Sequence, residues 1–264
     1  MCETLKISPL GIKSGLKTII LKLYAPKHKK SLGKRNAKII LKGVNLKIQK
    51  GETVALLGPN GSGKTVLAQT IAGNPKYKII KGGIYYHHRK IDSLPPEKRT
   101  NLGIVLGWQA PPLVKGVKLE DFLKIIQKTR ILNFLKPEES QILLKELNAN
   151  ISGGEKKISE LLQILSLKPK LVIFDEIDSG LDIKNLERIA KTIKKEIIQK
   201  KVATLFITHN GQVIKFLKPT KTLVMVDGKI ICQSKDYQKI LKTIKKYGYE
   251  KCKKCPFSSD RPYS

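Results

Sequence analysis

The chain has 264 residues, and its apolar content of 41% is enough to bury a hydrophobic core, which excludes a wholly disordered protein. No apolar run approaches the roughly 18–20 residues that span a bilayer, so we expect no direct membrane insertion. Basic residues number 52 against 21 acidic ones, a formal charge of +31, but only six of the basic residues are arginine. Lysines spread along the whole chain indicate a solvated basic surface, because sequence-specific nucleic-acid recognition favours arginine.

Cysteine usage and the N-terminal sequence bear on location. Four cysteines in a chain of this length do not make a disulfide scaffold and fit a reducing compartment. The N-terminal region lacks the pattern of a secretory leader, so we expect a cytoplasmic protein. Cys252 and Cys255 form a C-x-x-C pair, which supplies half of a zinc or thiolate site. An inert tail is the alternative for this pair.

In chain order, strand-like and helix-like segments alternate, which predicts an α/β protein with a parallel sheet buried on both faces. Alternating or continuous apolar patterns predict strands at residues 4–10, 39–47, 53–57, 171–174, 203–208, 223–226 and 229–232. Helical periodicity predicts helices at residues 64–71, 152–167 and 183–200, and two short helices within 117–147. The lysine-dense stretch at 24–35 is expected to be a loop or an elaborated hairpin.

The most specific motif follows the predicted strand 53–57. The pattern G-x-x-x-x-G-K-[ST] is matched by Gly58, Pro59, Asn60, Gly61, Ser62, Gly63, Lys64 and Thr65. Glycines let successive backbone N–H groups point inward at phosphate oxygens, and the following helix adds the positive end of its dipole. Lys64 is expected to reach the β and γ phosphates, and Thr65 to ligate Mg²⁺. The motif therefore predicts a nucleotide site, with Val66 next in the chain.

Two adjacent carboxylates end the apolar strand 171–174. This pattern places Asp175 and Glu176 at the carboxyl end of a buried strand, where α/β sheets hold their ligands. We expect Asp175 to support the Mg²⁺ ion and Glu176 to polarise the attacking water.

A third segment lies between the phosphate loop and the paired acids. It reads Ile-Ser-Gly-Gly-Glu at 151–155, and a Ser-Gly-Gly at a helix start exposes backbone donors to an anion. In this order, the three segments resemble the motifs of ATP-binding-cassette (ABC) ATPases. By this resemblance, Gln109 matches the Q-loop glutamine, residues 179–182 match the D-loop, and His209 matches the switch histidine.

The ABC resemblance implies a fold and a set of roles. The fold is a RecA-like parallel-sheet core with an antiparallel β subdomain, formed by residues 1–108 and 152–246, with a reduced helical subdomain at 109–151 and a Cys-containing tail at 247–264. Two copies would bind ATP head to tail. The implied catalytic residues are Glu176, His209, Gln109 and Lys64. The implied Mg²⁺ ligands are Thr65, Gln109 and Asp175. The implied nucleotide contacts are the phosphate loop through Val66, with Ser152, Gly153, Gly154, Glu155 and Asp182.

Finer features are similar to SufC, the ATPase family of SUF iron–sulfur cluster assembly. Glutamate stands at 155 where most cassettes have glutamine, and the similarity extends to residues 72–77, 94–99, 108–112 and 175–183. It implies a SufB-like scaffold as partner, with or without a SufD-like protein, and an ATP-dependent contact between two copies. The partner would dock on residues 109–116 and the helices of 117–147.

The sequence also departs from this family. The stretch between Gln109 and Ser152 is short, which favours a minimal pair of ATPase and scaffold, and the lysine-rich insertion at 11–37 is longer than usual. No aromatic residue aligns to stack adenine. Tyr24 is a candidate, and a surface tyrosine without this role is the alternative. Two other functions stay open at this point. One is the ATPase subunit of a membrane transporter, and the other is a nucleic-acid-associated cassette, which usually carries a coiled-coil insertion or a second cassette.

Overall fold

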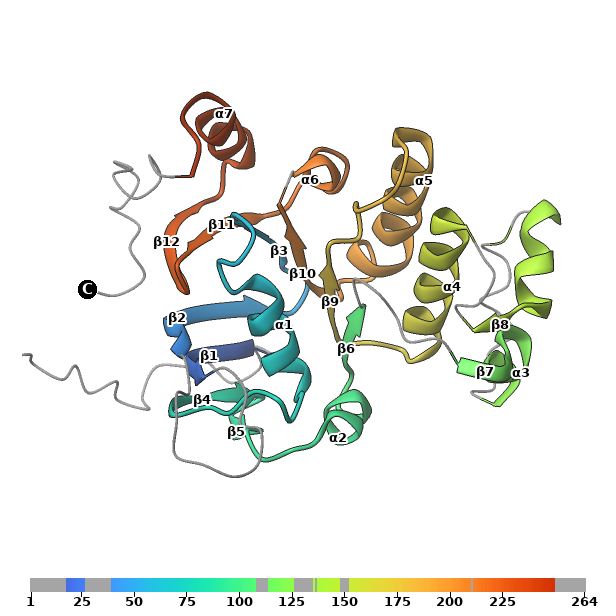
Figure 1. Ribbon diagram of the computed structural model, residues 1–264, viewed down its shortest axis with the longest axis horizontal. Coiled ribbons are helices and arrows are strands. Elements are labelled where there is room, and N and C mark those ends of the chain that lie inside the picture. Colours follow the sequence, from blue (N-terminus) through green and yellow to red (C-terminus); the bar gives the residue numbers. More distant parts are fainter. Residues whose placement is uncertain are drawn as a thin grey trace, which may run out of the picture.

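The computed structural model describes residues 18–26, 39–107, 114–125, 135, 137–147, 152–209 and 211–249 (Figure 1). The predicted strand at 4–10, Gln109 and the Cys252–Cys255 pair lie outside these residues. The segments that join the predicted helical subdomain to the core, residues 108–113 and 148–151, also lie outside them. The domain boundaries therefore stay predictions.

A six-stranded sheet forms the centre of the structure, in the order β12-β11-β3-β10-β9-β6. All neighbouring strands run parallel except β11 and β12, which form an antiparallel hairpin. Every residue of β3, β9 and β10 is buried, which explains their apolar sequences. The strands are β3 (Thr53–Leu57), β6 (Ile104–Gly107), β9 (Leu171–Asp175), β10 (Ala203–Thr208), β11 (Lys221–Val226) and β12 (Lys229–Ser234).

Helices cover one face of this sheet, and a mixed layer covers the other (Figure 1). Alternation along β3 separates the two cores, since Ala55 and Leu57 face the helices while Val54 and Leu56 face the opposite layer. The helical face carries α4 (Gly153–Ser166), α5 (Ile183–Ile193), the π-helical turn η3 (Lys194–Ile198), α6 (Gln212–Leu217) and α7 (Tyr237–Tyr247). The opposite layer holds α1 (Lys64–Ala72) and α2 (Pro96–Asn101) beside a second sheet.

The second sheet is antiparallel, and it uses part of the lysine-rich insertion. Its order is β2-β1-β4-β5, with β1 (Thr18–Pro26), β2 (Ile39–Gln49), β4 (Lys81–Tyr86) and β5 (Arg89–Lys90). Strand β1 comes from residues 11–37 and pairs on one side with β2 and on the other with β4. The insertion therefore supplies an inner strand of this sheet.

A small subdomain, described at 114–125, 135 and 137–147, lies beside α4 at the far end of the molecule from α7 (Figure 1). Its elements are β7 (Val114–Lys118), α3 (Leu119–Ile125), the 3₁₀ helix η2 (Pro137–Leu144) and β8 (Glu146–Leu147). Leu119, Leu123, Ile142 and Leu147 form a separate core that includes Leu162 of α4. Of the two short helices predicted here, the described residues form one α-helix and one 3₁₀ helix.

A buried arginine fixes the far end of α1. Arg99 is only 2% exposed, and its guanidinium donates to the carbonyl oxygens of Thr70, Ile71, Asp92 and Leu94 at 2.8–2.9 Å. Two of these carbonyls belong to the last turn of α1, where helix carbonyls lack partners. Arg99 therefore ties α1 to the segment that precedes α2.

The turn between β11 and β12 joins the two sheets at Gly228. Its N–H donates to the carbonyl oxygen of Ser62 at 2.9 Å, and its own carbonyl accepts from the N–H of Lys42 at 2.8 Å. Gly228 has a φ of +78°, and a Cβ there would lie 1.8 Å from the carbonyl oxygen of Ile40. Only glycine fits at this point without a backbone shift.

The substitution Gly228→Ala is expected to lower the free energy of unfolding by about 3 kcal/mol or more, because both backbone hydrogen bonds must shift. Gly116→Ala is the matched control, since its φ is +76° and nothing lies within 4 Å of its Cβ position. The free energy of unfolding of this control should fall by only about 1–2 kcal/mol, which is the cost of placing alanine in a left-handed backbone conformation. Urea unfolding measures both, and equal losses would contradict the close contact at Gly228.

Candidate nucleotide-binding site

The P-loop, residues 58–65, connects β3 to α1 and is packed tightly at its start. A Cβ on Gly58 would lie 2.2 Å from the carbonyl oxygen of Met225, so the loop passes against β11 with no space for a side chain. The Lys64 ammonium donates hydrogen bonds to the carbonyl oxygens of Gly58 at 2.8 Å and Pro59 at 2.9 Å. The loop therefore curls around its own lysine.

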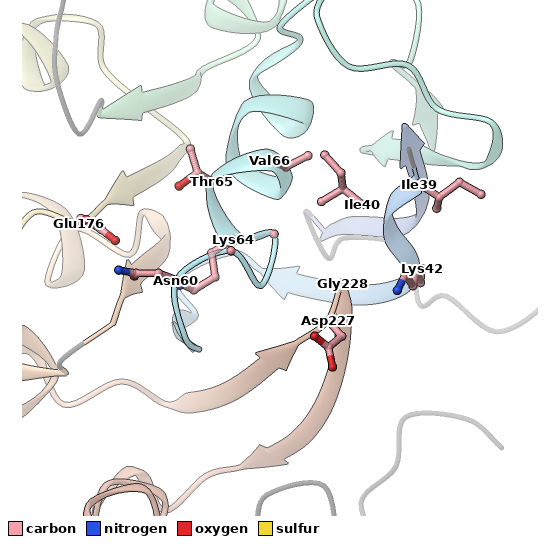
Figure 2. Close-up of a pocket in the computed structure, with 12 residues that line it drawn as sticks. Ile39, Ile40, Lys42, Asn60, Lys64, Thr65, Val66, Glu176, Asp227 and Gly228 are labelled. Atoms are coloured by element: carbon pink, nitrogen blue, oxygen red, sulfur yellow. The ribbon is translucent and has the colours of Figure 1, made fainter. Parts of the chain in front are cut away.

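A cavity of ≈ 570 Å³ opens beside the P-loop (Figure 2). This volume lies in the range of small-molecule sites. Its walls come from the P-loop, the start of β2, the residue after β9, and the turn between β11 and β12. The lining residues are Ile39, Ile40, Lys42, Asn60, Gly61, Gly63, Lys64, Thr65, Val66, Glu176, Asp227 and Gly228.

A carboxylate and a hydroxyl meet at the edge of the P-loop. Asp175 ends β9 and is 4% exposed, and the Thr65 hydroxyl donates to its Oδ1 at 3.3 Å. Burial raises the pKa of Asp175 to about 6; the Thr65 hydrogen bond opposes this rise, and the Glu176 carboxylate adds to it. Burial likewise lowers the pKa of Lys64, against the attraction of Glu176 and Asp175. Both ions are thus held in a site that desolvates charge.

Glu176 and His209 follow two adjacent strands and face each other. Glu176 has a φ of +56°, a left-handed value that is rare outside glycine, and its N–H donates to the carbonyl oxygen of Ile207 at 2.9 Å. The turned backbone brings the Glu176 side chain to the cavity (Figure 2). Its Oε1 lies 3.4 Å from Nδ1 of His209. The strained backbone is a feature that often marks functional positions.

The signature segment, residues 152–155, begins α4 with a capping box. The Ser152 hydroxyl accepts from the N–H of Glu155 at 3.3 Å, and Glu155 Oε2 accepts from the N–H of Ser152 at 2.8 Å. Gly153 and Gly154 occupy the first two helical positions, whose N–H groups have no partner within a helix. This helix start therefore presents donors outward.

Asp182 caps the next helix, α5, close to the signature segment. Its carboxylate accepts from the N–H of Asn185 at 2.9 Å, and this hydrogen bond lowers the pKa of Asp182. The two helix starts are neighbours, because a Cβ on Gly154 would lie 3.5 Å from the side-chain nitrogen of Asn185 in the first turn of α5. A Cβ on Gly153 would lie 3.4 Å from the carbonyl oxygen of Gly180 in the preceding loop. In the described part of the chain, neither the signature segment nor Asp182 lines the cavity.

A scan against known families matches residues 41–179 to the ABC transporter model. The chain belongs to the ABC transporter family. The matched range includes the P-loop, the signature segment and the paired acids, while His209 lies beyond it. The predicted ABC fold is confirmed, and the protein is an ABC-type ATPase whose substrate is ATP with Mg²⁺ as cofactor.

Curated relatives and solved structures agree with this assignment. The chain is 39% identical over 211 residues to the probable ATP-dependent transporter ycf16 of Cyanidium caldarium, covering 73% of this chain and 83% of that protein. It is 37% identical over 211 residues to a probable ABC transporter ATP-binding protein of Streptococcus pyogenes serotype M3, covering 74% and 82%. The dimeric structure of the bacterial ABC transporter cassette MJ0796 is similar in fold, with a TM-score of 0.69, 24% identity, and coverage of 82% and 97%.

The residues present at this ABC site fit a triphosphate and a divalent cation. Ser62 Oγ is buried and has no hydrogen-bond partner among the described residues, so the P-loop holds a donor that a phosphate oxygen would satisfy. Oxygen ligands such as those of Thr65 and Asp175 suit Mg²⁺. Among the predicted residues, Val66 lines the cavity, whereas Gln109 lies outside the described residues and its role stays a prediction.

Five lining residues were not predicted from the sequence: Ile39, Ile40, Lys42, Asp227 and Gly228. Ile39 and Ile40 place an aliphatic wall opposite the P-loop, and among the residues that the structure describes, none that lines the cavity is aromatic (Figure 2). An Asp-Gly pair between two strands signals a hairpin turn, but the turn's contact with the P-loop depends on strand order in the sheet. The candidate Tyr24 lies in β1, opposite Lys42 of β2, and its stacking role stays a prediction.

The raised pKa of Asp175 predicts a pH-dependent loss of stability without magnesium. The pKa of about 6 in the folded protein lies above the ordinary aspartate value of 3.8. The stability that the protonated Asp175 gives is therefore fully present below pH about 4 and is lost as pH rises through 6. Asp175→Asn should therefore raise the free energy of unfolding at pH 7.5 by about 1–3 kcal/mol and flatten its dependence between pH 4.5 and 7.

Urea unfolding in EDTA across this pH range measures the effect. Asp121→Asn removes an exposed carboxylate from α3 and serves as the control, which should follow the unsubstituted protein. Parallel pH profiles for the Asp175→Asn variant and the unsubstituted protein would contradict the role of the buried carboxylate.

Proposed function

We propose that this ABC ATPase is a SufC-type subunit that uses ATP to change the conformation of a SufB-like scaffold during iron–sulfur cluster assembly. The observation that supports it most is the helix start Ser-Gly-Gly-Glu-Lys-Lys at 152–157. Glu155 closes the capping box there, and the following turn buries Lys157 in an ion pair with Glu160 at 3.1 Å. The match with SufC motifs continues in residues 175–183.

In this function, residues that line the cavity act together with residues beside it. Lys64 and the P-loop N–H groups would hold the β and γ phosphates, and Thr65 and Asp175 would hold the metal, with Gln109. Magnesium, when bound, neutralises charge on the phosphates. Glu176 would accept a hydrogen bond from the attacking water, and His209, 3.4 Å away, would orient that carboxylate and contact the γ phosphate.

The signature segment would act on the ATP held by a second copy of the chain. Three observations support this arrangement. Its capping hydroxyl and N–H groups point out from the start of α4, it lies beside the D-loop through Gly153 and Gly180, and it does not line the chain's own described cavity. Two copies placed head to tail would complete two sites, with Ser152, Gly153 and Gly154 facing the γ phosphate.

The small subdomain is the proposed docking surface for the scaffold. It exposes apolar side chains that its own core leaves out, namely Val114, Ile125 and Leu144, the last two 78% and 61% exposed. Lys115 and Lys118 lie on the same strand as Val114, β7, and are exposed too. Such an apolar surface with basic neighbours suits a partner helix with an acidic rim.

An ATPase subunit of a membrane transporter is the second candidate function. The names of the relatives support it, since both describe transporters or their ATP-binding proteins. No helix in the described part of the chain is both long and apolar enough to cross a membrane. Cytosolic location belongs to the SufC proposal, and the cysteine usage supports it. For Cys252 and Cys255, which lie outside the described residues, the metal role and the inert tail both stay open.

Co-expression with a SufB-like protein tests the proposed function. We expect a stable complex, ATP hydrolysis faster than that of the ATPase alone, and a cluster chromophore on the partner. Glu176→Gln in the complex should bind ATP and lose hydrolysis by about 10²- to 10⁴-fold, because the group that activates water is gone. Failure to associate, together with capture by a permease, would place the protein in transport instead.

Charge reversal on β7 tests the docking surface. The double substitution Lys115→Glu/Lys118→Glu should weaken association with the scaffold about tenfold and leave ATP hydrolysis by the isolated subunit unchanged. Lys239→Glu/Lys242→Glu on α7, at the opposite end of the molecule, is the matched control (Figure 1). Affinity for the immobilised scaffold measures both. Equal losses of affinity in the β7 and α7 variants would mean that the overall charge of the protein alone drives binding.

A further inference from the structure

Glu155 of the signature segment is held by two donors. Its Oε2 accepts from the N–H of Ser152, and its Oε1 accepts from the ammonium of Lys145, both at 2.8 Å. The Lys145 hydrogen bond is the main cause that lowers the pKa of Glu155 below its ordinary value. Glu155 is therefore an ionised carboxylate at the start of α4, and Lys145 is its counter-ion.

A carboxylate at this place poses an electrostatic problem for the proposed dimer. The N–H groups of Gly153 and Gly154 and the hydroxyl of Ser152 would face the γ phosphate bound by the second copy. Glu155 follows them by one residue, and a negative charge there repels an incoming phosphate. A neutral side chain would not repel it, so a signature segment with glutamate needs a nearby positive charge that neutralises the carboxylate.

Lys145 is fixed where its ammonium can neutralise the Glu155 carboxylate. Its N–H donates to the carbonyl oxygen of Ile142 at 3.2 Å, and its carbonyl accepts from the N–H of Leu119 at 3.0 Å. The backbone of Lys145 is thus anchored in the small subdomain, and its side chain reaches α4. Both partners of the ion pair are about one-third exposed, at 36% for Lys145 and 33% for Glu155.

We propose that Lys145 is a positioning residue for ATP-driven dimerisation, which neutralises Glu155 and holds it in the capping box while the helix start approaches the partner's γ phosphate. This inference rests on the proposed head-to-tail function. It assigns to the small subdomain a direct part in the signature segment, through one side chain ten positions upstream.

A double-mutant cycle between Lys145 and Glu155 tests the proposal. In a Glu176→Gln background that halts hydrolysis, Lys145→Met should raise the ATP concentration for half-maximal dimerisation about five- to tenfold. With Glu155→Gln present, the same Lys145→Met change should raise this ATP concentration less than about twofold, because glutamine keeps the capping box without the charge. Lys145→Arg, which keeps the charge, should stay within about twofold of lysine. The Lys145→Met effect should shrink in 0.5 M salt.

Controls separate the possible failures. Lys191→Met breaks a comparable ion pair with Glu187 (2.9 Å) on α5 and should leave dimerisation unchanged. If Lys145→Met raises the ATP concentration for half-maximal dimerisation equally with and without Glu155→Gln, the lysine is only a structural support and the proposal is overturned. If the Glu176→Gln protein binds a fluorescent ATP analogue but never dimerises, the head-to-tail function fails and the role of Lys145 fails with it.

Discussion

The attachment of the P-loop to β11 and its hairpin turn is the constraint on which the site depends. At one end, Gly58 passes against the carbonyl of Met225, and near the other, Ser62 receives a hydrogen bond from Gly228. The same turn binds Lys42 of the antiparallel sheet, so three separate elements meet at the loop. A loop fixed in this way keeps its N–H groups aimed before a phosphate arrives, which reduces the ordering that binding requires.

The parallel sheet then determines which charges face the loop. Strands β9 and β10 lie next to each other, so Asp175, Glu176 and His209 reach the same edge of the sheet. The raised pKa of Asp175 and the lowered pKa of Lys64 share their main cause, the burial of both groups. The folded chain thus carries two desolvated charges of opposite sign, and a ligand with phosphates and a cation complements both.

The sequence alone predicted the parts of the site that depend on local pattern. The P-loop, the paired acids and the signature helix each lie within a short segment, and the structure places the first two together. The sequence alone did not predict β1, because the strand pairs with residues far along the chain, such as Thr18 with Gln49 of β2 and Ile19 with Tyr86 of β4. Nor did it predict Asp227 at the cavity or the ion pair between Lys145 and Glu155, since these contacts depend on strand order and on the packing of the small subdomain.

Helix α4 links the two halves of this arrangement. Leu161 and Ile164 pack in the core beneath the main sheet, whereas Leu162 belongs to the core of the small subdomain. The helix therefore cannot shift against one core without disturbing the other, because packed interiors resist continuous deformation. A partner that bound the exposed surface of the small subdomain would act on the element that begins with Ser152. Lys145 adds a second, electrostatic connection between that surface and the same helix start, so scaffold docking and ATP sensing would share one rigid helix.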